Sequence, residues 1–320
     1  MGEQILKSTR RAYGEALVEL GERNERIVVL DADLSKSTYT NLFAKKFPNR
    51  FFNMGISECK MISCAAGLAT TGKIPFASSF AVFAAGRAWE MVRLSVGYTN
   101  LNVKIAASHA GISVGEDGPT HHCAEDIALM RVIPNMTVLV PADATETKKA
   151  VFASAEWQGP VYIRLGRPDI PIIFDDSYDF QIGKAYVLKE GKDVSILACG
   201  LMVWQALQAL ELLEKEGIEA ELVNVSTIKP LDEETILRSL SKTRCAVSAE
   251  EHNIIGGLGS AVAELITEKL PIPLERVGVK DRFAESGPWK ELLKKYGLTP
   301  EDIKQAALRA IERKEKGGLK

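Results

Sequence analysis

The 320-residue chain has little of what marks several protein classes. Its five cysteines are odd in number, scattered in apolar surroundings and free of any Cys-x-x-Cys pattern, which disfavours a disulfide framework and indicates reduced thiols in a cytoplasmic protein. No apolar run reaches the roughly 18 residues that a membrane span requires, and the N-terminus lacks a signal-peptide pattern. The formal net charge of −2 gives no indication of a nucleic-acid or membrane partner.

Histidine is also scarce, but its distribution is informative. Three of the four histidines, His109, His121 and His122, fall within fourteen positions of a segment that reads Ser-His-Ala-Gly-Ile-Ser-Val-Gly-Glu-Asp-Gly-Pro-Thr-His-His from residue 108 to 122. Because open α/β sheets bind ligands where loops leave the strands, these clustered groups indicate a site for a small polar substrate. A polar surface loop is the alternative. A metal site is disfavoured, since adjacent histidines on a helix or strand do not share a face and no His-Glu-x-x-His pattern accompanies them.

Short apolar runs alternate with amphipathic segments, a pattern typical of α/β folds with mostly parallel sheets. In the first half of the chain, this pattern predicts strands at 27–30, 103–107, 137–140 and 161–165. It predicts helices at 9–20, 57–69, 82–96, 123–130 and 145–157. The second half predicts strands at 194–197, 220–225 and 246–248 and helices at 204–216 and 260–270. The pattern breaks in a segment rich in proline and aspartate, so we expect two three-layer domains, 1–168 and 186–320, joined by a connector at 169–185.

The loop sequence Val114-Gly-Glu-Asp-Gly-Pro-Thr-His121 resembles the substrate loop of transketolases, which use thiamine diphosphate. The resemblance extends over nearly the whole chain, but only to the C-terminal half of a full-length transketolase. It implies a pyrimidine-binding domain followed by a transketolase C-terminal domain. The implied reaction is the transfer of a two-carbon ketol group from a ketose phosphate to an aldose phosphate, as in the pentose phosphate pathway.

The resemblance also implies a set of cofactor-binding residues. Glu58, in Met54-Gly-Ile-Ser-Glu58, would bond N1′ of the aminopyrimidine ring and favour its imino tautomer; as an isolated pattern, it could equally complement the dipole of a helix that Ser57 caps. Phe80 and Phe83 would enclose the ring, although their spacing alone favours a place in the core. Asp33 would lie near the cofactor.

One position of the implied ring slot departs from the family. Many transketolases have a tyrosine three residues beyond the second phenylalanine, whereas this chain has Gly86. Arg87 and Trp89 are the candidates for the far wall of the slot.

The implied substrate-binding residues begin with the loop. His109 and His121 would hydrogen-bond the hydroxyls at C1 and C3 of the donor ketose and move protons, and Asp117 would bind the hydroxyl at C2 of the acceptor. Ala110 stands where the family often has aspartate, and His122 is interpreted as a bystander.

The sugar phosphate would be held by Arg10, Arg167 and Ser37. The planar fork of arginine matches the oxygens of a phosphate. If the match to the family is shifted by one residue, Arg11 takes the place of Arg10. Arg167 matches the family's position for the other arginine better than Arg164.

A second glycine-rich segment, Glu250-Glu-His-Asn-Ile-Ile-Gly-Gly-Leu-Gly-Ser260, opens a predicted helix. Such a turn can bind phosphate. Its spacing is not Gly-x-Gly-x-x-Gly, and it lies late in its domain. We interpret it as close helix–sheet packing and an interface.

The family's diphosphate- and Mg²⁺-binding segment, Gly-Asp-Gly followed by a downstream asparagine, is not found in this chain. We therefore assign no metal ligand here and expect Mg²⁺ and the diphosphate to be bound mainly by a separate N-terminal transketolase subunit. The expected assembly is an α2β2 heterotetramer formed through a dimer of this chain.

Three alternatives remain open at this point. The chain could be the β-type subunit of a 2-oxoacid dehydrogenase, half of a deoxyxylulose-phosphate synthase, or a non-catalytic scaffold subunit. The first would not be expected to carry the loop with both histidines and the phosphate arginine. An inert scaffold has no physical need to retain Glu58, His109, His121, Asp117 and Arg167.

Overall fold

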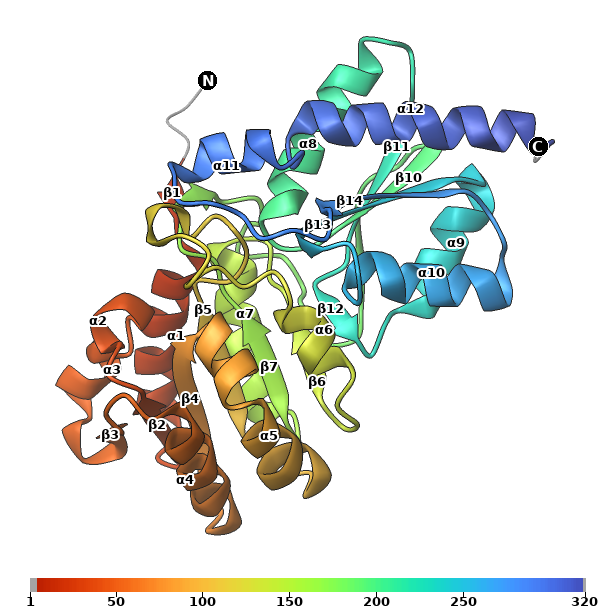
Figure 1. Cartoon of the computed structure of the whole chain (residues 1–320). Helices are drawn as coiled ribbons and strands as arrows, with labels where there is room; N and C mark the ends of the chain where they lie inside the picture. Colours follow the sequence, from red (N-terminus) through yellow and green to blue (C-terminus); the bar gives the residue numbers. More distant parts are fainter. Residues whose placement is uncertain (1–4, 319–320) are drawn as a thin grey trace.

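A computed structural model describes residues 5–318 and contains two helix-covered sheets that lie next to one another (Figure 1). The first sheet has the strand order β12 (Thr227–Lys229), β6 (Thr137–Leu139), β7 (Val161–Arg164), β5 (Lys104–Ser108), β4 (Ile74–Phe80), β2 (Ile27–Asp31), β3 (Phe51–Asn53). The second has the order β14 (Leu274–Val279), β13 (Ala246–Asn253), β10 (Val194–Ala198), β11 (Ala220–Asn224), β9 (Tyr186–Lys189). Only β12 and β9 run antiparallel to their neighbours in these two sheets. The predicted α/β fold with mostly parallel sheets is confirmed.

Helices cover both faces of the first sheet, as expected for a three-layer domain. Its helical segments are α1 (Thr9–Arg23), α2 (Ser35–Thr38), α3 (Asn41–Lys46), α4 (Glu58–Thr70), η2 (Val82–Arg87), α5 (Trp89–Met91), η3 (Val92–Tyr98), α6 (Asp126–Arg131) and α7 (Ala144–Glu156). Tyr13 and Val151 on α1 and α7 pack on one face, and Met61 and Val92 on α4 and η3 pack on the other. The inner strands of this sheet are buried on both faces and are mostly apolar, whereas the edge strand β3 is partly exposed.

Two predicted helices differ from the observed ones. The segment 82–96 is not one α-helix, since η2 and η3 are π-helical; the amide of Ala88, for example, donates to the carbonyl of Phe83, five residues earlier. The segment 123–130 becomes helical only at Asp126, because the backbone of Cys123 is paired with Gly111 across the base of the loop.

The second sheet is covered by α8 (Leu201–Glu214), α9 (Glu233–Thr243), α10 (Leu258–Lys269), α11 (Trp289–Lys295) and α12 (Pro300–Lys316). Helix α12 starts at a capping box, in which Thr299 and Asp302 satisfy each other's backbone amides, and it has Pro300 in its first turn. It packs with α8 on the outer face, as Figure 1 shows at the top of the molecule. The opposite face, with α9 and α10, continues into the core of the first domain.

The two halves of the chain are interlocked rather than separate. Strand β12 comes from the second half, yet it pairs with β6 at the edge of the first sheet. In the connector, β8 (Ile170–Pro171) pairs with β1 (Leu6–Lys7) at the start of the chain. The sequence-based division at 1–168, 169–185 and 186–320 therefore stays a proposal. Within residues 5–318, no helix combines the length and apolar character needed to cross a membrane.

Candidate active site

Several predicted site residues lie where neighbouring parallel strands end. Phe80 is the last residue of β4, His109 directly follows β5, and Asp33 and Arg167 lie on the loops after β2 and β7. Asp33 and His109 have φ angles of 65° and 58°, a left-handed conformation that is uncommon outside glycine and recurs at functional sites. One edge of the first sheet therefore gathers residues that are far apart in sequence.

Aromatic side chains form the centre of this edge. The Phe80 ring stacks on His109 with centroids 3.7 Å apart and lies 6.1 Å from Phe83. His121, from the far end of the loop, meets both phenylalanines edge-on at 6.2 and 5.6 Å. The two histidines are thus brought together by the phenylalanines predicted to enclose the cofactor ring.

Glu58 lies next to this cluster, at the first residue of α4. Its side chain is only 3% exposed, and Nη1 of Arg87 contacts its two carboxylate oxygens at 3.2 and 3.0 Å. The Arg87 guanidinium also stacks over Phe83, 4.7 Å from the ring centroid. Of the two candidates for the far wall of the ring slot, Arg87 therefore contacts Glu58 and Phe83. Trp89 instead donates from its indole to the carbonyl of Leu129. Residue 57 is the N-cap, but the predicted cap contact is absent, since the Ser57 hydroxyl makes no capping hydrogen bond.

Two arginines form a basic pair on the other side of His109. Arg10 donates from Nε to the carbonyl of Arg167 at 3.1 Å and from Nη1 to the carbonyl of Ser37 at 2.8 Å. Arg167 donates to the carbonyl of Val114 and pairs with Glu116 at 3.0 Å. Ser37 thus meets Arg10 through its backbone.

The two alternative arginines are engaged elsewhere. Arg11 is exposed and pairs with Glu15 on its own helix. Arg164 is buried in an ion pair with Asp126. The geometry therefore favours Arg10 and Arg167 over Arg11 and Arg164 as phosphate ligands.

The loop between β5 and α6 folds back on itself. It contains a 3₁₀ turn, η4 (Gly115–Asp117), which begins at Gly115 and is followed by Gly118. These two glycines have φ of 82° and 76°, which glycine adopts without strain. His121 is half-buried and hydrogen-bonds through Nδ1 to Thr120, and Asp117 is exposed. His122 points away into the loop interior, where Nε2 bonds the carbonyl of Gly115 at 3.1 Å.

Sequence reasoning did not find three features of this edge. The ion pair of Arg87 with Glu58, the contact of Glu116 with Arg167, and the bond from Ser108 to Nδ1 of His109 all depend on tertiary packing. Among residues 5–318, no group of three or more histidine, cysteine or acidic side chains is arranged to hold a metal ion.

The environment of His109 predicts a pH-dependent stability. Burial, followed by the positive charges of Arg10 and Arg167 and by His121, lowers the pKa of His109 from 6.5 to about 3. The unfolded chain takes up a proton on this histidine near its ordinary pKa, which the folded chain does not. The contribution to stability is therefore complete above pH 6.5 and is lost as the pH falls toward 3.

As the pH decreases below 6.5, we expect the free energy of unfolding of the isolated wild-type chain to decrease more steeply than that of His109→Gln. The difference in slope is up to about 1.4 kcal/mol per pH unit. Urea unfolding at a series of pH values measures both slopes. Identical slopes would contradict the prediction.

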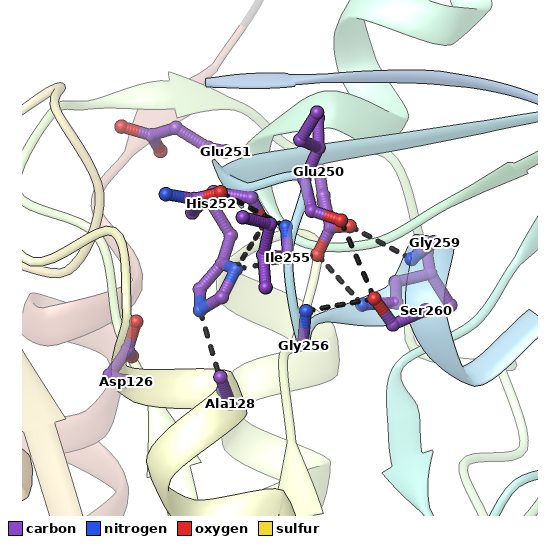
Figure 2. Close-up of polar contacts among 12 residues, drawn as sticks. Asp126, Ala128, Glu250, Glu251, His252, Ile255, Gly256, Gly259 and Ser260 are labelled. Carbon is purple, nitrogen blue, oxygen red and sulfur yellow. Dashed lines mark hydrogen bonds and ion pairs between the residues drawn. The ribbon is translucent and has the colours of Figure 1, made fainter. Parts of the chain in front are cut away.

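The glycine-rich segment of the second domain forms a different kind of site. Figure 2 shows the Glu250 carboxylate directed at the start of α10, where it accepts the amides of Leu258 and Gly259 at 2.7 and 2.8 Å. A carboxylate of the chain itself therefore occupies the position that a phosphate would take. This agrees with the interpretation as helix–sheet packing.

Comparison with known proteins decides the family. The transketolase pyrimidine binding domain family matches residues 7–172, and the transketolase C-terminal domain family matches residues 183–303. The chain belongs to the transketolase family.

The most informative relatives of this transketolase chain are themselves partial chains. It is 52% identical over 312 residues to a putative transketolase C-terminal section of Methanocaldococcus jannaschii, covering 97% of this chain and 98% of that protein. It is 47% identical to a 6-deoxy-6-sulfo-D-fructose transketolase subunit of a Clostridium species, with 95% of each covered. A solved structure described as a split gene transketolase, inactive beta4 tetramer, matches with a TM-score of 0.90 and 57% identity over 96% of this chain and 99% of that one.

The extent of the match confirms the predicted resemblance to the C-terminal half of a transketolase. The chain is 39% identical to human transketolase over 96% of its own length but spans only 49% of the human protein. The chain thus corresponds to a C-terminal section of a transketolase, and the family implies the use of thiamine diphosphate.

The residues of this transketolase section fit the pyrimidine end of that cofactor. Glu58 offers a buried carboxylate whose partner Arg87 is half exposed and attached to a flexible stem, so another hydrogen-bond donor can replace it. Phe80 and Phe83 offer flat apolar faces beside that carboxylate.

Proposed function

We propose that this chain is the catalytic C-terminal subunit of a two-subunit transketolase. It would transfer a two-carbon ketol group from a ketose phosphate to an aldose phosphate and be active only with a separate N-terminal subunit. The observation that carries the proposal is the convergence on one sheet edge of a buried carboxylate, an aromatic–histidine stack and a pair of arginines. We further propose that it works in the cytoplasm on sugar phosphates of the pentose phosphate pathway.

The cofactor end of the site would use Glu58, Phe80, Phe83 and Asp33. When bound, thiamine diphosphate supplies the carbon nucleophile and electron sink that ketol transfer requires. Glu58 would bond the ring nitrogen N1′ and hold a proton there, since its carboxylate is buried and linked to Phe83 through Arg87. Phe80 and Phe83 would orient the ring and exclude water from it. Asp33, exposed and fixed by Asn53 at 3.0 Å, would lie at the rim.

The substrate end would use the loop histidines. A neutral imidazole accepts as well as donates a proton, and the lowered pKa keeps His109 neutral at physiological pH. His109 and His121 would bind the hydroxyls at C1 and C3 of the donor and move protons to and from them. Asp117 would bind the acceptor's C2 hydroxyl, and a site that pairs a hydroxyl discriminates against analogues that lack it.

Arg10, Arg167 and Ser37 would hold the substrate phosphate. We expect Arg10→Ala to raise the KM for phosphorylated sugars by roughly 10- to 100-fold, the equivalent of one charged hydrogen bond. Arg11→Ala is the matched control, because Arg11 is its neighbour on α1 but pairs with Glu15 outside the site. Equal effects of the two substitutions on KM in the reconstituted complex would contradict the assignment of Arg10.

Mg²⁺ and the cofactor diphosphate would be bound mainly by the N-terminal subunit. The sequence supports this, because the family's diphosphate segment is not found in it. The related split chain, described as an inactive tetramer of β chains, supports a requirement for a partner. We propose an α2β2 heterotetramer built on a dimer of this chain.

The relatives named as transketolase sections and subunits favour ketol transfer over a 2-oxoacid dehydrogenase or deoxyxylulose-phosphate synthase reaction. The test is ketol transfer from xylulose 5-phosphate to ribose 5-phosphate with thiamine diphosphate and Mg²⁺. This chain is assayed alone and with its N-terminal partner. Activity in the mixture alone would support the proposal. Activity of this chain alone would refute the partner requirement, and a stable but inactive complex would redirect the search to other donors and acceptors, including sulfonated ketoses as donors.

A further inference from the structure

The C-terminal end of β13 contacts the substrate loop of the first domain. Glu250 and Glu251 are adjacent there and both are buried, with 1% and 4% of their surface exposed. Because side chains alternate along a strand, their carboxylates point in opposite directions, as Figure 2 shows. Glu250 caps α10 within its own domain. Glu251 faces the loop that carries the histidines.

The loop backbone lies directly on the Glu251 carboxylate. The amide of Ser113 donates to Oε1 of Glu251 at 2.5 Å. Gly111 approaches so closely that a Cβ at this position would lie 2.2 to 2.7 Å from the atoms of the carboxyl group, and its φ of 81° already favours glycine. A buried hydrogen bond to a carboxylate is stronger than one between neutral groups. Glu251 therefore fixes the first part of the loop, two to four residues after His109.

Other residues of the second domain hold the remainder of the loop. The amide of Asn253 donates to the carbonyl of Ala124 at 2.7 Å, where the loop returns toward α6. Nε2 of His252 accepts the amide of Ala128 at 3.4 Å, as Figure 2 also shows. Across the loop tip, the Ser286 hydroxyl donates to the carbonyl of Glu116.

Glu251 is itself held in place from the first domain. Arg164 donates from Nη2 to the carbonyl oxygen of Glu251 at 2.8 Å, and the same guanidinium is paired with Asp126. Glu251 is thus attached through its backbone to the sheet that supplies His109. Through its side chain it is attached to the loop that follows His109.

We propose that Glu251 is a positioning residue that holds the substrate loop in the conformation in which His109, Asp117 and His121 converge on the substrate. The inference rests on the proposed function of this loop. It gives the second domain a part in catalysis although none of its side chains belongs to the proposed site. A displacement of about 1 Å in such a loop is enough to reduce activity by about 100-fold.

The adjacent glutamates provide a matched pair for the test in the reconstituted complex. We expect Glu251→Ala to lower kcat/KM for ketol transfer by roughly 10- to 100-fold. Glu251→Gln retains an oxygen that accepts the Ser113 amide and should recover most of that loss. Glu250→Gln should lower the unfolding midpoint and leave kcat/KM near that of the wild type, because it weakens the cap of α10 but does not touch the loop.

The dependence of activity on cofactor concentration distinguishes a loss of loop positioning from a general disruption of the fold. The proposal predicts that Glu251→Ala raises the KM of the sugars and leaves the concentration of thiamine diphosphate giving half-maximal activity unchanged, because Glu58, Phe80 and Phe83 lie outside the loop. The proposal would be overturned if Glu250→Gln lowered kcat/KM as much as Glu251→Ala. It would also be overturned if Glu251→Ala raised the half-saturating concentration of thiamine diphosphate as much as the KM of the sugars.

Hydrogen exchange of the isolated chain tests the same contact without enzyme activity. In Glu251→Ala, amides in peptides covering 111–124 should exchange faster than in the wild type, while those at the start of α10 do not change. Glu250→Gln should give the reverse pattern. Unchanged exchange at 111–124 in Glu251→Ala would overturn the proposal. An inactive wild-type complex with the expected exchange pattern would count against ketol transfer between these two sugars and leave the contact between Glu251 and the loop supported.

Discussion

Glu58→Gln should lower the ketol-transfer kcat of the reconstituted complex by about 1000-fold, within the range attributed to a positioned acid–base group. Glutamine has nearly the shape of glutamate but cannot hold the proton that the ring nitrogen requires. The side chain lies at the first residue of α4 and its partner Arg87 is half exposed, so its loss should not disrupt the fold. Steady-state kinetics with saturating thiamine diphosphate and Mg²⁺ measures the effect.

The control for this prediction is Glu90→Gln. Glu90 is an exposed acid on α5, close in space to the same helices, and its substitution should leave kcat unchanged. Sedimentation of both complexes checks that assembly is intact. Retention of more than about a tenth of the wild-type kcat by Glu58→Gln would contradict the acid–base role and would favour the alternative of a helix-dipole or scaffold function.

Asp126→Ala should lower the free energy of unfolding by about 3 to 5 kcal/mol, the cost of removing one partner of a buried ion pair. The Arg164 and Asp126 side chains are 6% and 0% exposed and meet at 2.8 Å. The same carboxylate accepts the hydroxyl of Tyr162 at 2.8 Å. The substitution therefore leaves a buried guanidinium without its counter-charge and a buried hydroxyl without its acceptor. Urea unfolding of the isolated chain measures the loss.

The matched control is an exposed ion pair that also involves α6. Arg131 on α6 pairs with Glu264 on α10, whose side chain is 61% exposed. Because solvent screens this pair, Glu264→Ala should cost no more than about 1 kcal/mol. If both substitutions had the same cost, burial would not be what gives the Arg164–Asp126 pair its importance.

The sequence was sufficient for the fold class and for several of the residues that the structure gathers at one edge of the first sheet. Alternating apolar and amphipathic segments predicted the parallel sheets, and the cluster of histidines on a loop after a strand predicted the site at the carboxyl edge. The structure brings His109 and His121 onto Phe80 and Phe83, and the roles of these residues stay predictions. The fold prediction succeeds because it depends on local periodicity, and the convergence of these residues follows from the geometry common to parallel sheets.

Other choices depended on atoms far apart in sequence. Arg10 and Arg11 are indistinguishable by type and spacing, and only helix α1's orientation against the sheet directs Arg10 to the site. The same holds for Arg87 and Trp89, because the π-helical turns of η2 set which side chain meets Glu58. No periodicity in the sequence predicts that β12 joins the first sheet.

By itself, the sequence determined the alternation of strands and helices, the glycines that permit the loop's left-handed turns, and the residue types available for chemistry. Only the tertiary structure decided which of those residues face one another. Glu250 and Glu251 illustrate the difference. They are identical and adjacent, yet one caps a helix of its own domain and the other accepts a backbone amide of the loop between β5 and α6. The strand's two-residue period turns them to opposite faces, and what each face meets is set by how the two sheets pack.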